Sequence, residues 1–182
     1  MKVSIVRLTI FAVVGMMVAS VPVFAQSTEI MTDEHIANIK SNCQIARASL
    51  SRVHANDAPT YVNRNQTYFS IGDKMMATLN SRLSLNRFDA SELVRIASEY
   101  NDLVVQFRKV YRDYDDSMTA AMNTDCLKQP VGFYDKVAKA RESRKRVHDI
   151  VVRLTASLKE YRRAVQQFEI ENKDELSTGV KP

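Results

Sequence analysis

The chain contains very little glycine and proline, each of which occurs only four times in 182 residues. Beyond residue 25, glycine and proline occur only at positions 59, 72, 130, 132, 179 and 182, so long stretches lack any residue that commonly ends a helix. The sequence also lacks alternating apolar runs and the turn signals of β-hairpins. These absences exclude a β-sheet fold and predict a chain that is mostly helical.

The motifs of common catalytic and metal sites are absent as well. None of the three histidines follows a glutamate by three residues, so the Glu-x-x-His pairs of a metal–carboxylate bundle are missing. No serine lies in a Gly-x-Ser-x-Gly turn, which is the usual setting of a nucleophilic serine in hydrolases. We therefore predict that the protein is not an enzyme and that it carries no metal and no cofactor.

Residues 1–25 have the pattern of a secretory signal peptide. Two basic residues precede an apolar run that ends at Phe24, and small residues precede Gln26. We predict cleavage between Ala25 and Gln26 and a secreted or extracytoplasmic mature chain. The alternative is a membrane anchor, because an uncleaved apolar run of about 17 residues is close to the shortest transmembrane span.

The sequence has only two cysteines, Cys43 and Cys126. Export would place them in an oxidising compartment, where structural disulfides form and persist. We therefore predict a disulfide between them. The alternative is two free, buried thiols that pack as small apolar groups.

The net charge gives no evidence for nucleic-acid binding. It is formally +5 for the whole chain, and removing Lys2 and Arg7 with the signal peptide lowers it to +3.

The length of the mature chain fits one domain. We predict a flexible segment at 26–32, one helical bundle domain at 33–170, and a disordered tail at 171–182, where the apolar pattern is lost.

Apolar residues recur at three- and four-residue spacing, which is typical of coiled-coil-like helices. A break or kink is expected near Pro59, because proline removes a backbone donor. Asp89 and Glu92 have the spacing of a capping box, so a helix should begin at Ala90. Its apolar stripe comprises Leu93, Ile96, Ala97, Tyr100, Leu103, Val104, Phe107, Val110, Tyr111, Tyr114, Met118 and Ala121. The last helix has a stripe of Val137, Ala140, Arg144, Val147, Val151, Leu154, Leu158, Tyr161, Val165 and Phe168.

Helix lengths favour one arrangement of these segments. If Pro59 only kinks the first helix, three arms of about 65, 56 and 57 Å nearly match, and the two cysteines meet at one end. If Pro59 is instead a hairpin turn, the sulfur atoms lie about 39 Å apart, which is too far for a disulfide. We therefore predict an elongated three-helix antiparallel bundle with the first helix kinked near Pro59. A four-helix up-down bundle is the alternative.

One set of charged residues is expected inside this bundle. Arg144 is the single polar residue of the last stripe, and helix rise places it level with Asp57, Asp113 and Asp116. We interpret the four residues as a buried polar pin. Such an ion pair more often fixes helix register than binds a ligand.

The last helix also carries a basic cluster, whose members are Lys136, Lys139, Arg141, Lys145 and Arg146. A solvated helix face explains the cluster most simply. The functional alternative is a face for an anionic polymer or a membrane surface, extending from Lys136 to Arg163. No base-reading motif accompanies it, so specific nucleic-acid recognition is not expected.

Several short motifs carry a family resemblance: Asn42-Cys43, Asp57-Ala58, Val62-Asn63-Arg64, Ser81-Arg82-Leu83, Asp89 to Leu93, Asp125-Cys126 with Lys128 to Val131, and Phe133-Tyr134-Asp135. With them the chain resembles uncharacterised, exported two-cysteine helical proteins of reduced-genome, candidate-phylum bacteria. The resemblance implies export and paired cysteines, and it transfers no activity. The sequence thus predicts a structural or interaction module of the cell envelope or extracellular space, with an unknown protein partner or self-association.

Overall fold

The computed structural model describes residues 31–178, which belong to one compact, all-helical unit. The elements are α1 (Asp33–Ser41), α2 (Cys43–Ser70), the π-helix η1 (Ile71–Met76), α3 (Ala77–Leu85), α4 (Ser91–Met122), α5 (Pro130–Glu171) and α6 (Lys173–Thr178). No strand occurs among the described residues, so the prediction of an all-α fold is confirmed. The predicted signal peptide and its cleavage site lie outside the described residues.

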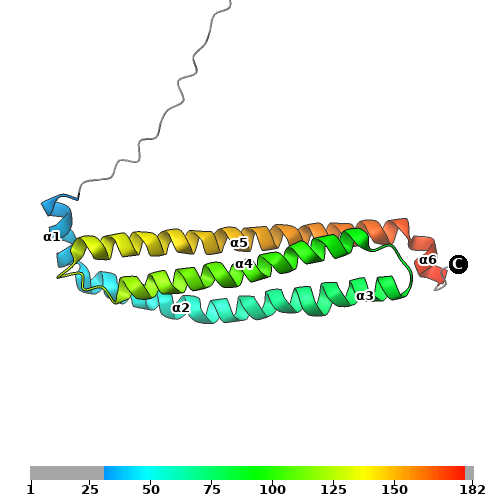
Figure 1. Ribbon diagram of the computed structural model, residues 1–182, viewed down its shortest axis with the longest axis horizontal. Coiled ribbons are helices and arrows are strands. Elements are labelled where there is room, and N and C mark those ends of the chain that lie inside the picture. Colours follow the sequence, from blue (N-terminus) through cyan, green and yellow to red (C-terminus); the bar gives the residue numbers. More distant parts are fainter. Residues whose placement is uncertain (1–30, 179–182) are drawn as a thin grey trace, which may run out of the picture. The chain divides into compact units, whose positions relative to one another are not determined.

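Three long stretches of helix lie side by side within this unit (Figure 1). The first consists of α2, η1 and α3, which follow one another without a gap. The chain then turns back into α4 and turns again into α5, so consecutive stretches are antiparallel. The largest interface joins α4 to α5, while α2, η1 and α3 pack on α4.

Helix α2 runs through Pro59, so the helix is not broken at this residue, and the kink expected there stays a prediction. Proline removes one backbone hydrogen bond from a helix interior. Contacts on both sides of Pro59 hold the helix in place, because Asp57 bonds to α5 and Tyr61 stacks on α4. These tertiary contacts offset the local cost of the proline.

The backbone departs from α-helical geometry farther along the chain, in η1. There the N–H of Ala77 donates to the carbonyl of Gly72, five residues back, instead of four as in an α-helix. Just beyond η1, the buried Asn80 accepts a hydrogen bond of 2.7 Å from the hydroxyl of Tyr161 on α5. No sequence signal had pointed to this wider turn.

Helix α4 begins one residue later than predicted. Ala90 occupies the N-cap position, and the Asp89 side chain accepts a hydrogen bond of 3.0 Å from the N–H of Ser91. Glu92 does not close a capping box and pairs instead with Arg95 at 2.7 Å. The buried residues of α4 are the predicted stripe with Ser117 in place of Val110: Leu93, Ile96, Ala97, Tyr100, Leu103, Val104, Phe107, Tyr111, Tyr114, Ser117, Met118 and Ala121.

The buried stripe of α5 matches the prediction only in part. Arg144 was expected inside, but its side chain is 57% exposed, so the description of a buried pin is wrong for this residue. Its neighbour Ser143 is fully buried, with its hydroxyl oxygen 3.2 Å from that of Ser117 on α4. Small side chains thus let α4 and α5 approach closely and turn Arg144 outward. The buried residues of α5 are Phe133, Ala140, Ser143, Ile150, Leu154, Ser157 and Tyr161.

A disulfide joins Cys43, at the start of α2, to Cys126, in the turn between α4 and α5. The two Cα atoms are 5.7 Å apart. Both cysteines are buried and pack against Phe133 in a small apolar cluster. The predicted pairing is therefore confirmed.

Part of the tail that was expected to be disordered is helical, because α6 covers Lys173–Thr178. Residues 179–182 lie outside the described residues.

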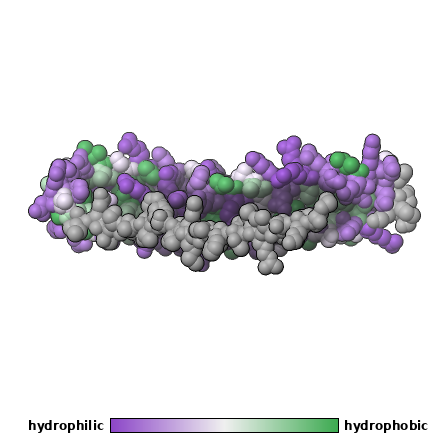
Figure 2. Space-filling model, turned by 90° about the horizontal axis from the view of Figure 1, so that it is seen from above, coloured by the Kyte–Doolittle hydropathy of each residue, from purple (hydrophilic) through white to green (hydrophobic). Residues whose placement is uncertain are grey.

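The surface of the described part is mostly polar on the face shown in Figure 2, where apolar side chains lie in small, separate patches. Within residues 31–178, no helix combines the length and the apolar character needed to cross a bilayer.

Replacing both cysteines by serine should lower the free energy of unfolding by about 2 to 4 kcal/mol, because the disulfide closes a long loop in the unfolded chain. The bonded residues are separated by 83 positions. Urea unfolding measures the effect, and reduced wild-type protein is the matched control. An unchanged unfolding midpoint in both samples would contradict a stabilising role.

Candidate functional site

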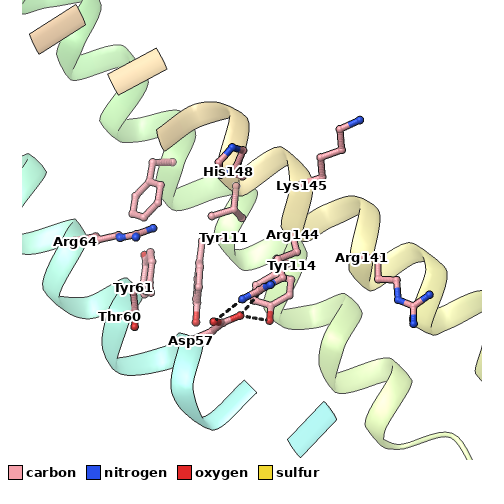
Figure 3. Close-up of a pocket in the computed structure, with 12 residues that line it drawn as sticks. Asp57, Thr60, Tyr61, Arg64, Tyr111, Tyr114, Arg141, Arg144, Lys145 and His148 are labelled. Atoms are coloured by element: carbon pink, nitrogen blue, oxygen red, sulfur yellow. Dashed lines mark hydrogen bonds and ion pairs between the residues drawn. The ribbon is translucent and has the colours of Figure 1, made fainter. Parts of the chain in front are cut away.

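An ion pair with a tyrosine joins α2, α4 and α5, and we call it the Asp57 cluster. Arg144 donates to Asp57 twice, from Nε to Oδ2 at 2.9 Å and from Nη2 to Oδ1 at 3.0 Å. The hydroxyl of Tyr114 donates to the same Oδ2 at 2.6 Å. Figure 3 shows the three side chains converging from the three helices. The structure thus brings together Asp57 and Arg144 as predicted and adds Tyr114.

The electrostatics of the cluster keep Asp57 ionised. Burial alone raises the pKa of the Asp57 carboxyl, but the hydrogen bonds from Arg144 and Tyr114 and the charge of Arg144 outweigh burial, so the pKa lies below its usual value. For Tyr114, burial and the bond to Asp57 both raise the pKa of the hydroxyl, which therefore remains a donor at neutral pH. The charge of Asp57 is consequently compensated within the cluster.

A groove of about 480 Å³ lies beside the cluster, between α2 and α5, and we call it the α2–α5 groove. Buried aromatic residues of α4, Phe107 and Tyr111, form its floor. Tyr61 of α2 stacks on Tyr111 with ring centroids 3.6 Å apart and planes 8° from parallel. Phe107 lies 5.5 Å from Tyr61, so the bottom of the groove is a continuous aromatic surface.

Cationic residues also line this groove. Arg64 comes from α2, and Arg141, Arg144 and Lys145 come from α5 (Figure 3). Asp57 is the one acidic residue among the described residues that line the groove, so four cations and one carboxylate leave a formal charge of +3. Only Arg144 is paired, and the other three cations form no ion pair with any residue in 31–178.

The hydroxyl of Tyr111 has no hydrogen-bond partner among the described residues, although the residue is only 8% exposed. Buried polar groups in native proteins are nearly always paired, so this hydroxyl is exceptional. Burial raises the pKa of Tyr111, and the nearby carboxylates of Asp115 and Asp57 raise it further. The group is therefore protonated, and it lies beside Asp57 (Figure 3).

The other two members of the predicted polar pin lie elsewhere. Asp113 and Asp116 line a second groove together with Lys136, Lys139 and Arg146, and neither bonds to Arg144. Successive residues of a helix point about 100° apart, so a match in height does not place two residues on the same face. The predicted four-residue pin is thus reduced to the pair of Asp57 and Arg144.

The predicted anionic-ligand face is divided between the two grooves. Arg141 and Lys145 line the α2–α5 groove. The remaining three basic residues line the second groove, where Lys136 donates to the hydroxyl of Thr124 at 2.8 Å. The five residues therefore do not form one continuous cationic surface.

Possible metal ligands are sparse in the part of the chain that the structure describes. No three side chains of His, Cys, Asp or Glu lie close enough there to hold a metal ion. His54 and Asp115 form a pair, with Nε2 and Oδ1 2.7 Å apart. A structural zinc site uses four protein ligands, so this pair alone makes none.

Several residues that line the groove were not identified as site residues from the sequence, among them Tyr61, Arg64, Tyr111 and Tyr114. One signal was available for Arg64, which follows Asp57 by one heptad and so shares its helix face. The tyrosines of α4 were correctly placed on the buried stripe. A stripe does not reveal which ring carries an unpaired hydroxyl.

Replacing Asp57 by Asn should lower the free energy of unfolding by about 1 kcal/mol at pH 7, a value that allows for the exposure of Arg144. Because the pKa of Asp57 is lowered in the folded state, its contribution is present above the unfolded-state pKa and is lost as pH falls through the folded-state pKa. The difference between wild type and variant should therefore shrink below about pH 4.

Urea unfolding at pH 7 and pH 3 measures this difference. The control is Asp102→Asn, which removes an exposed carboxylate of α4 that forms no ion pair within residues 31–178. A loss of stability for Asp57→Asn that is the same at both pH values would contradict the assignment.

Comparison with known proteins gives no family assignment. No protein-family model, curated protein or solved structure matches this chain. The resemblance to exported two-cysteine proteins therefore stays a prediction, and function has to be inferred from the site itself.

Proposed function

We propose that the protein is an extracytoplasmic, non-enzymatic interaction module that holds an anionic group of its partner in the α2–α5 groove. The proposed fold is a three-helix antiparallel bundle, whose helical segments cover residues 43–85, 91–122 and 130–171. The disulfide of Cys43 and Cys126 supports an oxidising location, because such bonds are rare in reducing compartments.

The observation that carries the proposal is the composition of the groove. An aromatic floor with nearby cations combines apolar area with charge, and binding sites commonly have this character. Three of these cations have no ion partner within residues 31–178, so we take them as available to an external anion. A helical bundle that served only as a spacer between other proteins would need neither the aromatic floor nor the cations.

The second candidate is an extended basic face for an anionic polymer or membrane surface, running from Lys136 to Arg163. Two observations make it weaker than the groove. The basic residues of α5 are divided between two grooves, and several of them already bond within the protein. Arg153, for example, donates to Gln106 of α4 at 3.3 Å.

Binding of long-chain polyphosphate distinguishes the two candidates, because this polymer has charge and no apolar part. Arg64→Gln combined with Lys145→Gln should weaken binding about fivefold, the size of two partly exposed ionic contacts. Lys136→Gln combined with Lys139→Gln removes the same charge outside the groove, and should change binding less than twofold. Titration at low salt measures both constants.

Equal losses for the two double variants would favour the extended face instead. No measurable binding of polyphosphate would count against both candidates, because each requires the cations to attract anions.

The extracytoplasmic location has a separate test. Native protein should begin at Gln26 and should yield a peptide in which Cys43 is joined to Cys126. Mass spectrometry without reduction measures both features. A native chain that begins at residue 1 and has free thiols would contradict export.

A further inference from the structure

We propose, building on the function proposed above, that the anionic partner of the α2–α5 groove is a second copy of this chain. In this assembly an acidic segment of one copy, residues 169–176, lies along the groove side of the other copy. Glutamates of the segment face the outward cations of α5. The exposed Ile170 of the segment packs into an apolar groove beside those cations.

The bundle leaves one side open to a further helix. In the part of the chain that the structure describes, no Cα atom of α2 lies within 8 Å of a Cα atom of α5, although both helices pack on α4. Helices in direct contact have axes only about 8 to 10 Å apart, so α2 and α5 are not direct neighbours. An amphipathic helix can bind in a groove between two such helices.

An apolar groove lies on this side close to the disulfide, and we call it the disulfide groove. Ile39 of α1, Leu50 of α2 and Val137 of α5 are among its lining residues, and all three are only half-buried. They pack against the cluster around the two cysteines. The volume of the disulfide groove, about 210 Å³, is below the range of roughly 300 to 1,000 Å³ for small-molecule sites, so it suits one or two apolar side chains of a partner.

Cations continue from this groove along α5. Arg141 lines both the disulfide groove and the α2–α5 groove, so the two grooves adjoin at this residue. Val137, Arg141 and Lys145 follow one another at four-residue spacing, which puts them on one face of the helix. Arg141 and Lys145 extend outward, away from the aromatic rings (Figure 3). This face therefore offers an apolar contact followed by two charges at the surface.

The end of the bundle opposite the disulfide carries a complementary segment (Figure 1). Residues 169–176 cover the end of α5 and the start of α6, and they include four acidic residues and one lysine, a formal charge of −3. Ile170 lies among these charges and is 70% exposed. Glu169 and Glu171 form no ion pair within residues 31–178. The segment thus combines an uncovered apolar side chain with acidic neighbours.

The turn between α3 and α4 does not reverse the charge of this end. Phe88 of the turn packs on Phe168, with ring centroids 5.6 Å apart. Arg87 and Asp89 flank Phe88 and cancel each other in formal charge. The charged residues that line the two grooves are four cations and one carboxylate, a formal charge of +3. The acidic end of one copy and the groove side of another therefore attract each other.

Charge also decides how two copies meet. A contact of groove with groove would oppose cations, and a contact of two acidic segments would oppose carboxylates, so each contact joins two different surfaces. The two surfaces lie at opposite ends of the bundle (Figure 1). Two antiparallel copies can exchange both contacts, and copies in line form a longer chain. Both arrangements require the contact proposed here.

Sedimentation of the native, disulfide-bonded protein at low salt tests for the assembly. The mean mass should rise with protein concentration, and it should fall toward the mass of the monomer as added salt screens the charges. A single monomeric species at every concentration up to the solubility limit would overturn the proposal.

Charge reversal tests which surfaces meet. Arg141→Glu combined with Lys145→Glu should weaken association about tenfold or more, because like charges would then face each other. Glu169→Lys combined with Glu171→Lys should have the same effect. All four substitutions in one chain restore opposite charges on the two surfaces and the wild-type net charge, so association should return. A monomeric protein with all four substitutions would show that these surfaces do not meet.

The control for net charge is Asp73→Lys combined with Asp102→Lys, which replaces two exposed aspartates outside both surfaces. It changes the net charge as much as the double glutamate variant does, and it should change association less than about twofold. Equal losses in the two double variants would contradict the proposed contact.

Ile170→Ser tests the apolar part of the contact and leaves the charges in place. It should weaken association about fivefold or more, because it removes an apolar side chain from the proposed interface. Val105→Ser is the matched control, because Val105 is a 63% exposed residue of α4 that lines neither groove. Both side chains are exposed in the single copy, so the thermal midpoint should stay the same. Equal effects on association would overturn the proposed docking of Ile170.

Polyphosphate separates failure of this inference from failure of the proposed function. If the protein stays monomeric, and polyphosphate binding still depends on Arg64 and Lys145, the second-copy inference is wrong and the anionic partner is another molecule. If neither association nor polyphosphate binding depends on the cations of the groove, both proposals are wrong.

Discussion

The disulfide between Cys43 and Cys126 is the constraint on which the arrangement of the site depends. It ties the start of α2 to the turn between α4 and α5. Measured from that end, Asp57 lies about 21 Å along α2 and Tyr114 about 18 Å back along α4. The bond therefore sets the register in which Asp57 meets Tyr114, and in which Arg144 of α5 reaches both.

Close packing of α4 on α5 determines which side chains face the groove. Ser117 and Ser143 meet at this interface, and their small size lets the two helices approach. Arg144 follows Ser143 in the chain, so it is turned to the edge of the interface and toward α2. Cations thus gather beside an aromatic floor because of packing inside the bundle. The buried hydroxyl of Tyr111 lies beside the Asp57 carboxylate (Figure 3).

Patterns that depend on one helix or on chain length could be predicted from the sequence. The all-helical fold, the disulfide and the buried stripe of α4 are examples. The contact of Asp57 with Arg144 followed from helix rise. Features that depend on the rotation of one helix against another were missed. The predicted stripe placed Arg144 inside, whereas its neighbour Ser143 is the buried residue, and Asp113 was grouped with Arg144 by height alone.

A double-mutant cycle on Asp57 and Arg144 tests most directly whether the disulfide sets the register of the site. The coupling free energy of the pair is measured by urea unfolding, both in the disulfide-bonded protein and with both cysteines replaced by serine. We predict a coupling of about 1 kcal/mol with the disulfide and less than half of that without it. The same coupling in both backgrounds would contradict the account, because the register would then be fixed by helix packing alone.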